Sequence, residues 1–317
     1  MIKGKNVFSL ALFWVALAFP FFAMGQAPKG LWEKANKSCF DYLNNGDLNL
    51  ARSACSEAVR AAEMIKGDLM PLAQSLSNLG TLLSRLGEYS LAESAYARSL
   101  KTAEQAAGKE STMTALAAGA LGLLYIDIGK FDLAEPLLKR ALATDEKILG
   151  PNSDYVATDL NNLGLLRIKQ KRFSDAELLL QRSLSITEKL HGKNNIESME
   201  AMNNLGTVYL EQGKNVDAEA ILVRVLNIRE ASLPAMHPDI AESLNNLGMV
   251  MKAQGKFKAA EALYQRCLFI VESAMGATHP RAATVMLNLA EVVGAQGRNQ
   301  EAEALIRKGK SILQVAK

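Results

Sequence analysis

Histidine is the side chain that most readily exchanges protons near neutral pH, and its ring nitrogens are common metal ligands. The chain has three histidines, His191, His237 and His279. His237 and His279 each precede a proline, and they hold the same place in two successive segments of similar sequence, so a metal shared by the two is one interpretation. No acidic or cysteine ligands accompany both of them, however. We therefore predict no metal site, and we expect each His-Pro pair to cap or pack a loop between helices.

The sequence also lacks the short motifs that carry most catalytic chemistry. It contains no Gly-x-Ser-x-Gly nucleophile elbow, no His-Glu-x-x-His and no Cys-x-x-Cys. Gly248, Gly255 and Lys256 are too widely spaced for a phosphate-binding loop, which would also need to follow a strand. We therefore expect a protein without catalytic activity and without a bound cofactor.

The pattern that dominates the chain is an internal repeat with a period of 42, and such self-similarity is the signature of repeat architectures. A Leu-Gly pair recurs at this interval from Leu79-Gly80 to Leu247-Gly248, and Leu289-Ala290 continues the series. An Ala-Glu pair keeps the same interval, and a glycine lies between the two markers in every unit except at Lys171. A further unit lies upstream, one position out of step, and begins at Trp32.

The pattern of apolar residues in each unit predicts two helices. In the sixth unit, Leu244, Leu247, Gly248 and Met251 follow the i, i+3, i+4, i+7 spacing of one helical face. A glycine then ends the first helix, and small residues in both helices allow a close crossing. No strand pattern occurs, so we predict an all-α solenoid of seven helix pairs. The predicted units are 32–72, 73–114, 115–156, 157–198, 199–240, 241–282 and 283–317, the last acting as a C-terminal cap.

Several short sequences within the units are shared with a known family. These are Leu-Asn-Asn-Leu-Gly (160–164 and 244–248), Gln-Gly-Lys-Phe (254–257), Ala-Glu-Ala-Leu-Tyr-Gln-Arg (260–266) and His-Pro-Asp (237–239). They resemble the tetratricopeptide repeat (TPR), in the 42-residue form found in kinesin light chains and bacterial relatives. The resemblance covers residues 32–317 and implies a right-handed superhelical solenoid that binds peptides in a concave groove. The departures from the pattern are Lys171 for the turn glycine, Ala290 for the close-packing glycine, and Asn215 and Asn299 for an aromatic residue.

The segment 1–25 differs in composition from the rest of the chain. Lys3 and Lys5 precede an uncharged apolar stretch, residues 7–23, and small residues follow. This pattern is typical of a secretory signal peptide, which we expect to be cleaved after Gly25 or, alternatively, after Ala27. The 17-residue stretch is at the lower limit for spanning a bilayer, so an uncleaved membrane anchor is the alternative. We therefore predict an exported protein that is periplasmic or secreted.

The overall composition excludes several classes of protein. With 49% hydrophobic residues the chain can bury a core, and 36 basic against 33 acidic residues give a net charge of +3. Removal of Lys3 and Lys5 with the signal peptide lowers this to +1, so we predict no nucleic-acid partner and no membrane contact beyond the export signal. Cys39 and Cys55 lie on the two predicted helices of the first unit. In an oxidising compartment they either form a disulfide or remain two buried thiols, and both possibilities stay open.

An asparagine recurs at one position of the first helix in five units. These residues are Asn78, Asn162, Asn204, Asn246 and Asn288. Because asparagine is a mediocre helix former, its recurrence needs a reason. Either each amide bonds to the backbone of an extended peptide, or the amides bond to neighbouring helices and hold the units in register. We favour peptide contact and expect Arg85 and Lys169 to be basic members of the same mixed surface.

These observations predict a non-catalytic scaffold that binds a peptide segment or partner domain in a concave groove. The alternative is a structural or assembly module of an envelope complex that acts through its end units or its convex face. A row of arginines on the second helices is interpreted as solvated or paired with the recurring glutamates. The row consists of Arg98, Arg140, Arg182, Arg224 and Arg266.

Overall fold

A computed structural model describes residues 28–315 of the chain. This part forms fourteen α-helices and one 3-10 turn and has no strand, which confirms the predicted all-α class. The predicted signal peptide, residues 1–25, lies outside the described residues. None of the helices between residues 28 and 315 is long and apolar enough to cross a membrane.

The helices form seven consecutive pairs. The first helices of the pairs are α1 (Pro28–Asn45), α3 (Met70–Arg85), α5 (Thr112–Asp127), α7 (Asp154–Lys169), α9 (Met199–Glu211), α11 (Pro238–Ala253) and α13 (Pro280–Ala295). The second helices are α2 (Leu48–Glu63), α4 (Tyr89–Ala107), α6 (Phe131–Leu149), α8 (Phe173–His191), α10 (Asn215–Ser232), α12 (Phe257–Met275) and α14 (Asn299–Val315). The 3-10 turn η1 (Ile196–Ser198) leads directly into α9.

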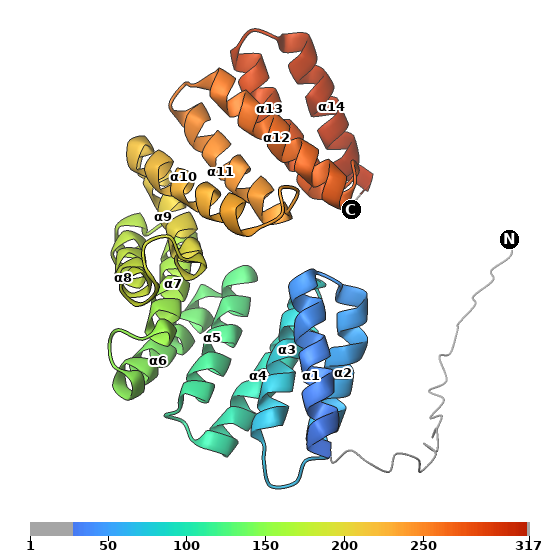
Figure 1. Cartoon of the computed structure of the whole chain (residues 1–317), viewed down its shortest axis with the longest axis vertical. Coiled ribbons are helices and arrows are strands. Elements are labelled where there is room, and N and C mark those ends of the chain that lie inside the picture. Colours follow the sequence, from blue (N-terminus) through green and yellow to red (C-terminus); the bar gives the residue numbers. More distant parts are fainter. Residues whose placement is uncertain (1–27, 316–317) are drawn as a thin grey trace, which may run out of the picture.

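The pairs stack in chain order into a curved solenoid (Figure 1). Each second helix packs against its own first helix, and each one from α2 to α12 also packs against the first helix of the next pair. Successive first helices also contact one another, as α3 does with α5 and α5 with α7. The first helices therefore line the inner, concave side, and the second helices form the outer side.

The predicted close crossing within each pair is confirmed by the space around the repeated Leu-Gly glycines. A Cβ atom added at Gly164 would lie 2.7 Å from Leu180 Cδ2, and one at Gly248 would lie 2.7 Å from Tyr264 Cε1. The large side chain of the second helix thus occupies the space that a first-helix side chain would need. A glycine within a helix is less favourable than alanine, but its missing side chain is what allows the two helices to cross this closely.

The turn between the two helices requires a left-handed backbone in each unit. Gly129 and Gly213 both adopt φ 73°, a conformation that glycine reaches without steric cost. Lys171 stands at the equivalent place in its unit and keeps the same conformation, with φ 59°. It is the one non-glycine residue with positive φ between residues 28 and 315. The geometry of the turn is therefore set by the packing of the pair and overrides the preference of the local residue.

The first pair is joined covalently. Cys39 of α1 and Cys55 of α2 form a disulfide with a Cα–Cα distance of 4.7 Å, and neither side chain is exposed. Of the two possibilities left open by the sequence, the structure has the bridge. The bond links the two helices of the first pair, which within the described residues packs against one other pair. Trp32 adds a second link, because its Nε1 donates to Ser75 Oγ of α3 at 2.8 Å.

Candidate functional site

The two repeated histidines lie where first helices begin. His237 Nδ1 accepts the Asp239 N–H at 3.2 Å, and His279 Nδ1 accepts the Arg281 N–H at 3.1 Å. Each ring therefore satisfies one of the free N–H groups at a helix N-terminus. This confirms the predicted capping role. Within residues 28–315, no three His, Cys, Asp or Glu side chains are grouped closely enough to hold a metal ion.

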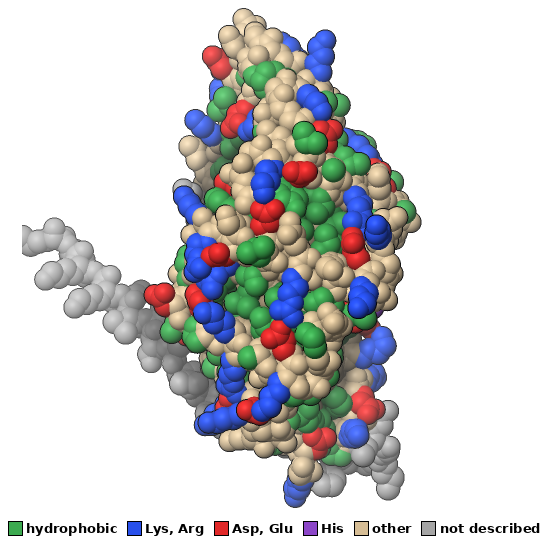
Figure 2. Space-filling view, turned by 90° about the vertical axis from the view of Figure 1, so that its left-hand side faces the viewer, with side chains coloured by type: hydrophobic (Ala, Val, Ile, Leu, Met, Phe, Trp, Pro, Cys, Tyr) green, Lys and Arg blue, Asp and Glu red, His purple; other side chains and the backbone are tan. Residues whose placement is uncertain are grey.

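The arginine row is paired with glutamates, as predicted. Each arginine forms an ion pair with a glutamate of the preceding second helix. The pairs are Arg98–Glu63, Arg140–Glu104, Arg182–Glu146, Arg224–Glu188 and Arg266–Glu230. Figure 2 shows the side of the molecule on which α6 and α8 lie, where basic and acidic side chains alternate between apolar ones. This face thus has no surface of one charge sign that would attract a polyanion.

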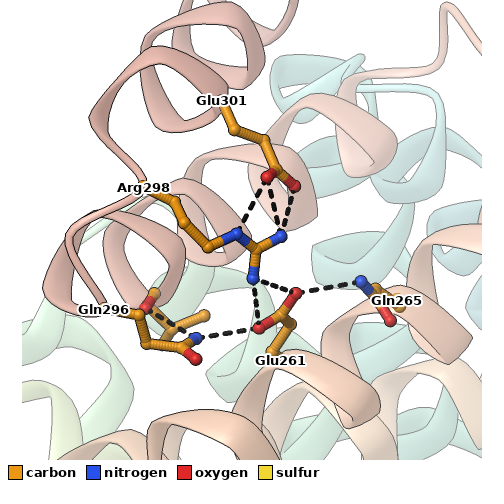
Figure 3. A network of polar contacts seen from close by, with 6 residues as sticks. Glu261, Gln265, Gln296, Arg298 and Glu301 are labelled. Carbon is orange, nitrogen blue, oxygen red and sulfur yellow. Dashed lines mark hydrogen bonds and ion pairs between the residues drawn. The ribbon is translucent and has the colours of Figure 1, made fainter.

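A second set of polar contacts joins the units near their turns. Glu261 of α12 accepts hydrogen bonds from Arg298 Nη1 at 2.8 and 2.9 Å and from Gln296 Nε2 at 2.8 Å (Figure 3). Arg298 in turn contacts Glu301 of α14. The hydrogen bonds from Arg298 and then Gln296 hold the pKa of Glu261 below its usual value. These charges are used in joining neighbouring units, so we assign them no docking role.

The asparagine row makes contacts between units at three of its five positions. Asn78 Nδ2 donates to Asn36 Oδ1 at 3.0 Å. Asn204 and Asn288 donate in the same way to Asn161 and Asn245 of the preceding first helix, each at 2.9 Å. The interpretation that these amides hold neighbouring helices in register therefore applies to Asn78, Asn204 and Asn288. Contact with a peptide, which we favoured for the whole row including Asn162 and Asn246, stays a prediction.

The two basic residues expected near the asparagines have different surroundings. Arg85 Nη1 donates to the Leu43 carbonyl oxygen near the C-terminal end of α1, so its guanidinium is partly used between units. Lys169 is exposed at the end of α7. Burial raises the pKa of Asp127, and the nearby Lys169 charge partly offsets this rise. Lys169 thus lies close to an acidic neighbour of the preceding first helix, as expected for a surface of mixed charge.

A pocket of about 540 Å³ opens among the first helices α1, α3, α5 and α7. Its walls are more apolar than polar. The larger apolar side chains are Phe40, Met113, Leu116 and Leu123, and the polar ones include Gln74, Asn78, Asp159 and Asn162. Two of the five predicted asparagines therefore meet in this pocket, whereas Asn204, Asn246 and Asn288 lie outside it.

Asp159 is the residue of this pocket that the sequence analysis missed. Its side chain is 6% exposed, and its Oδ2 has no hydrogen-bond partner in the described part of the chain. Burial, followed by the charges of Asp145 and Glu146, raises its pKa from 3.8 to about 8. Comparison of the repeat units could have indicated Asp159, because the equivalent position of every other aligned unit has a small or apolar residue. Those residues are Ser75, Ala117, Ala201, Ser243 and Val285.

The stacked pairs, their glycine crossings and the concave pocket define a helical-repeat protein of the solenoid class. The sequence profile of the tetratricopeptide repeat matches residues 34–105, 112–189, 179–231 and 239–314. The chain therefore belongs to the tetratricopeptide repeat family, as its motifs indicated. Proteins with this repeat generally act as non-catalytic scaffolds for protein interaction. Among curated proteins, none matches the chain.

Solved structures show the same architecture. BtubC (BKLC) from P. vanneervenii is 26% identical, with 81% of this chain and 95% of that chain covered and a TM-score of 0.56. Nearly identical TPR-like repeats assigned to a kinesin light chain of Podosopora anserina are 21% identical, with 66% and 99% covered and a TM-score of 0.57. A Rap protein complexed with Competence and Sporulation Factor is 14% identical, with 90% and 77% covered and a TM-score of 0.63. At 21% and 14% identity, the Podosopora anserina repeats and the Rap protein show a similarity of fold alone.

Proposed function

We propose that the protein is a non-catalytic scaffold that binds a peptide segment or domain of a partner protein in its concave groove. The proposed centre of binding is the pocket among α1, α3, α5 and α7. This pocket is the observation that carries the proposal, because ligand sites are concave, mostly apolar and furnished with a few polar groups. Phe40 and Leu116 line it and are 55% and 42% exposed, so a partner would cover apolar surface there.

The amides of the pocket suit an extended peptide. Asn78 uses one N–H toward Asn36, and an amide group has a second N–H that can donate to a peptide carbonyl. Asn162 is 7% exposed and lines the same pocket. Alternating donors and acceptors beside apolar walls are what a peptide backbone with apolar side chains requires. We propose a protein or peptide partner on these grounds, and neither a nucleic acid nor a membrane.

The partner would be met outside the cytoplasm, because we propose that the protein is exported to a periplasm or secreted. The bridge between Cys39 and Cys55 supports this, since disulfides persist in oxidising compartments. Mass spectrometry of the N-terminal peptide, on protein recovered from envelope and medium fractions, tests the proposal. A mature end at residue 26 or 28 is the expected result. An intact Met1 in the membrane fraction would favour the anchor, and reduced protein confined to the cytoplasm would contradict export.

A matched pair of variants tests the groove. Leu116→Lys places a charge in the pocket, and Leu178→Lys places the same charge on the second helix α8, where Leu178 is 69% exposed. Both leucines are exposed, so we expect both variants to keep the circular dichroism spectrum of the wild type. A partner recovered from the native envelope by cross-linking should bind Leu116→Lys at least about tenfold more weakly and Leu178→Lys with unchanged affinity. The opposite pattern would favour the alternative, an assembly module that uses its convex face.

A further inference from the structure

The pocket contains a carboxyl group that nothing in the fold requires. Asp159 lines it, is 6% exposed, and leaves Oδ2 without a hydrogen-bond partner in the described residues. Buried polar groups are almost always hydrogen-bonded, so an orphan of this kind calls for an explanation. Other units of the same fold fill this position with serine, alanine or valine, as at Ser75 and Ala117. Packing of the first helix therefore does not need an acid at residue 159.

A second buried acid lies beside it. Asp145 of α6 is 1% exposed, and its Oδ1 also lacks a partner in the described residues. The relation between the two positions can be seen two units further along the chain, where the equivalent pair is Arg229 and Ser243. There Arg229 Nη1 donates to Ser243 Oγ at 2.8 Å, so the two positions face each other across the unit boundary. At residues 145 and 159 this boundary has two acids in place of a donor and an acceptor.

Within the described residues, the charges that act on Asp159 most strongly are negative. The charged groups that act on it are Asp145 and Glu146, both on α6, and Glu146 is already paired with Arg182 of α8. The residues of α1, α3 and α5 that line the pocket are all uncharged. A positive group that entered the pocket would therefore favour the ionised form of Asp159 and would be attracted by the carboxylate that forms.

The absence of a side chain at Gly119 leaves space beside the carboxyl group of Asp159, on the pocket side of α5. A Cβ atom at Gly119 would lie 3.9 Å from both Asp159 Oδ1 and Asn162 Nδ2. The apolar walls formed by Leu116, Leu123 and Met113 suit the aliphatic stem of a long side chain. Lysine and arginine combine such a stem with a charged, hydrogen-bond-donating end.

We propose that Asp159 anchors the peptide by accepting hydrogen bonds from the cationic end of a lysine or arginine side chain. The stem of that side chain lies between Leu116 and Leu123, and the Asn162 amide oxygen offers a second acceptor. The inference rests on the proposed function, because it names the partner chemistry of the same groove. Binding then requires the ionised form of Asp159, so a proton leaves the carboxyl group when the peptide binds below pH 8.

Three peptide pools test the proposal. They are fluorescent heptapeptides, acetylated and amidated at their ends, with lysine, arginine or norleucine fixed at the centre and neutral residues elsewhere. At pH 8 the full chain should bind the lysine or the arginine pool at least about 30-fold more tightly than the norleucine pool. The comparison of the lysine and arginine pools shows which end group fits. Between pH 6 and pH 8 the tighter pool should gain affinity about 50-fold while the norleucine pool stays constant.

Variants assign this preference to one carboxyl group. Asp159→Asn should remove it and leave the affinity for the norleucine pool unchanged. Asp159→Ser repeats the test with the residue that equivalent units have at this position, in case the amide perturbs folding. Asp127→Asn is the matched control, because it removes an acid of α5 that does not line the pocket, and it should keep the preference.

Each outcome bears on a different claim. Binding of both the lysine and the arginine pool no tighter than the norleucine pool, or a preference that survives Asp159→Asn and Asp159→Ser, would overturn the cationic anchor and leave the groove itself in place. Loss of the preference in Asp127→Asn as well would also overturn it, because a diffuse negative field would then be the cause. Binding of no pool would contradict both the anchor and the proposed function.

Discussion

Replacing Asp159 by asparagine is expected to stabilise the fold, by an amount that grows with pH. Burial and the Asp145 and Glu146 charges raise the pKa of Asp159 to about 8, whereas the carboxyl group of an unfolded chain titrates near 3.8. Between these two values the folded chain holds one proton more than the unfolded chain. The contribution of Asp159 to the free energy of unfolding therefore falls as pH rises through this window, and it levels off above about pH 8.

The size of the expected change in unfolding free energy follows from the pH range over which the folded and unfolded chains differ by one proton. One pH unit corresponds to about 1.4 kcal/mol for a single proton, so the effect of Asp159 changes by about 3 kcal/mol between pH 5 and pH 7. Asparagine has nearly the same shape and does not titrate, so the variant lacks this slope. The gap in unfolding free energy between Asp159→Asn and the wild type should widen by that amount, whatever the constant effect of the amide on packing.

Urea unfolding followed by circular dichroism at pH 5 and pH 7 measures the gap. The matched control is Glu57→Gln, which removes an exposed carboxyl group from the outer helix α2 and should leave the gap nearly constant. If the difference in unfolding free energy between Asp159→Asn and the wild type is the same at both pH values, the pKa of Asp159 is not raised in the folded chain, and the residue titrates as an ordinary solvated acid.

Three further predictions concern the backbone of the solenoid. Gly164→Ala should lower the free energy of unfolding by about 1–3 kcal/mol, because the new Cβ would lie 2.7 Å from Leu180. Gly119→Ala, whose Cβ would have neighbours at 3.9 Å, should be neutral or stabilising by up to about 1 kcal/mol, and urea midpoints compare the two variants. Lys171→Gly should stabilise by about 1 kcal/mol, because it relieves a left-handed backbone at φ 59°, and a lower melting temperature would contradict this. Reduction of the Cys39–Cys55 bridge should destabilise the first pair by about 3 kcal/mol, detected as faster hydrogen exchange in α1 and α2, whereas unchanged exchange would show that the bridge constrains nothing.

The repeat allowed most of the fold to be predicted from the sequence. A glycine such as Gly164 at a constant interval indicates a backbone position that repeated packing must satisfy, and the structure places Leu180 against it. His237 and His279 were predicted to cap or pack a loop because no metal ligands accompany both of them, and both rings accept a helix N–H. Such features depend on local geometry, which one unit already specifies.

The candidate site was harder to predict because it depends on how the units are offset in space. Asn204 meets Asn161, 43 residues earlier, and a period of 42 alone does not indicate that neighbour. Asp159 was missed for a different reason. The residues predicted for the site recur from unit to unit, whereas Asp159 is an exception at a position where the other aligned units have small or apolar residues. The charge of Asp145 comes from α6, and only the packing of α6 against α7 brings the two acids together.

Photo-cross-linking within the native host can show where the partner binds, because it captures the partner without requiring that its identity be known. A photoreactive phenylalanine derivative replaces Leu116 in the pocket or, in a second strain, Leu178 on the outer helix α8. The proposed function predicts a discrete protein adduct from position 116 and none from position 178, and the proposed anchor predicts that Asp159→Asn weakens the adduct. An adduct from position 178 together with none from position 116 would contradict binding in the concave groove.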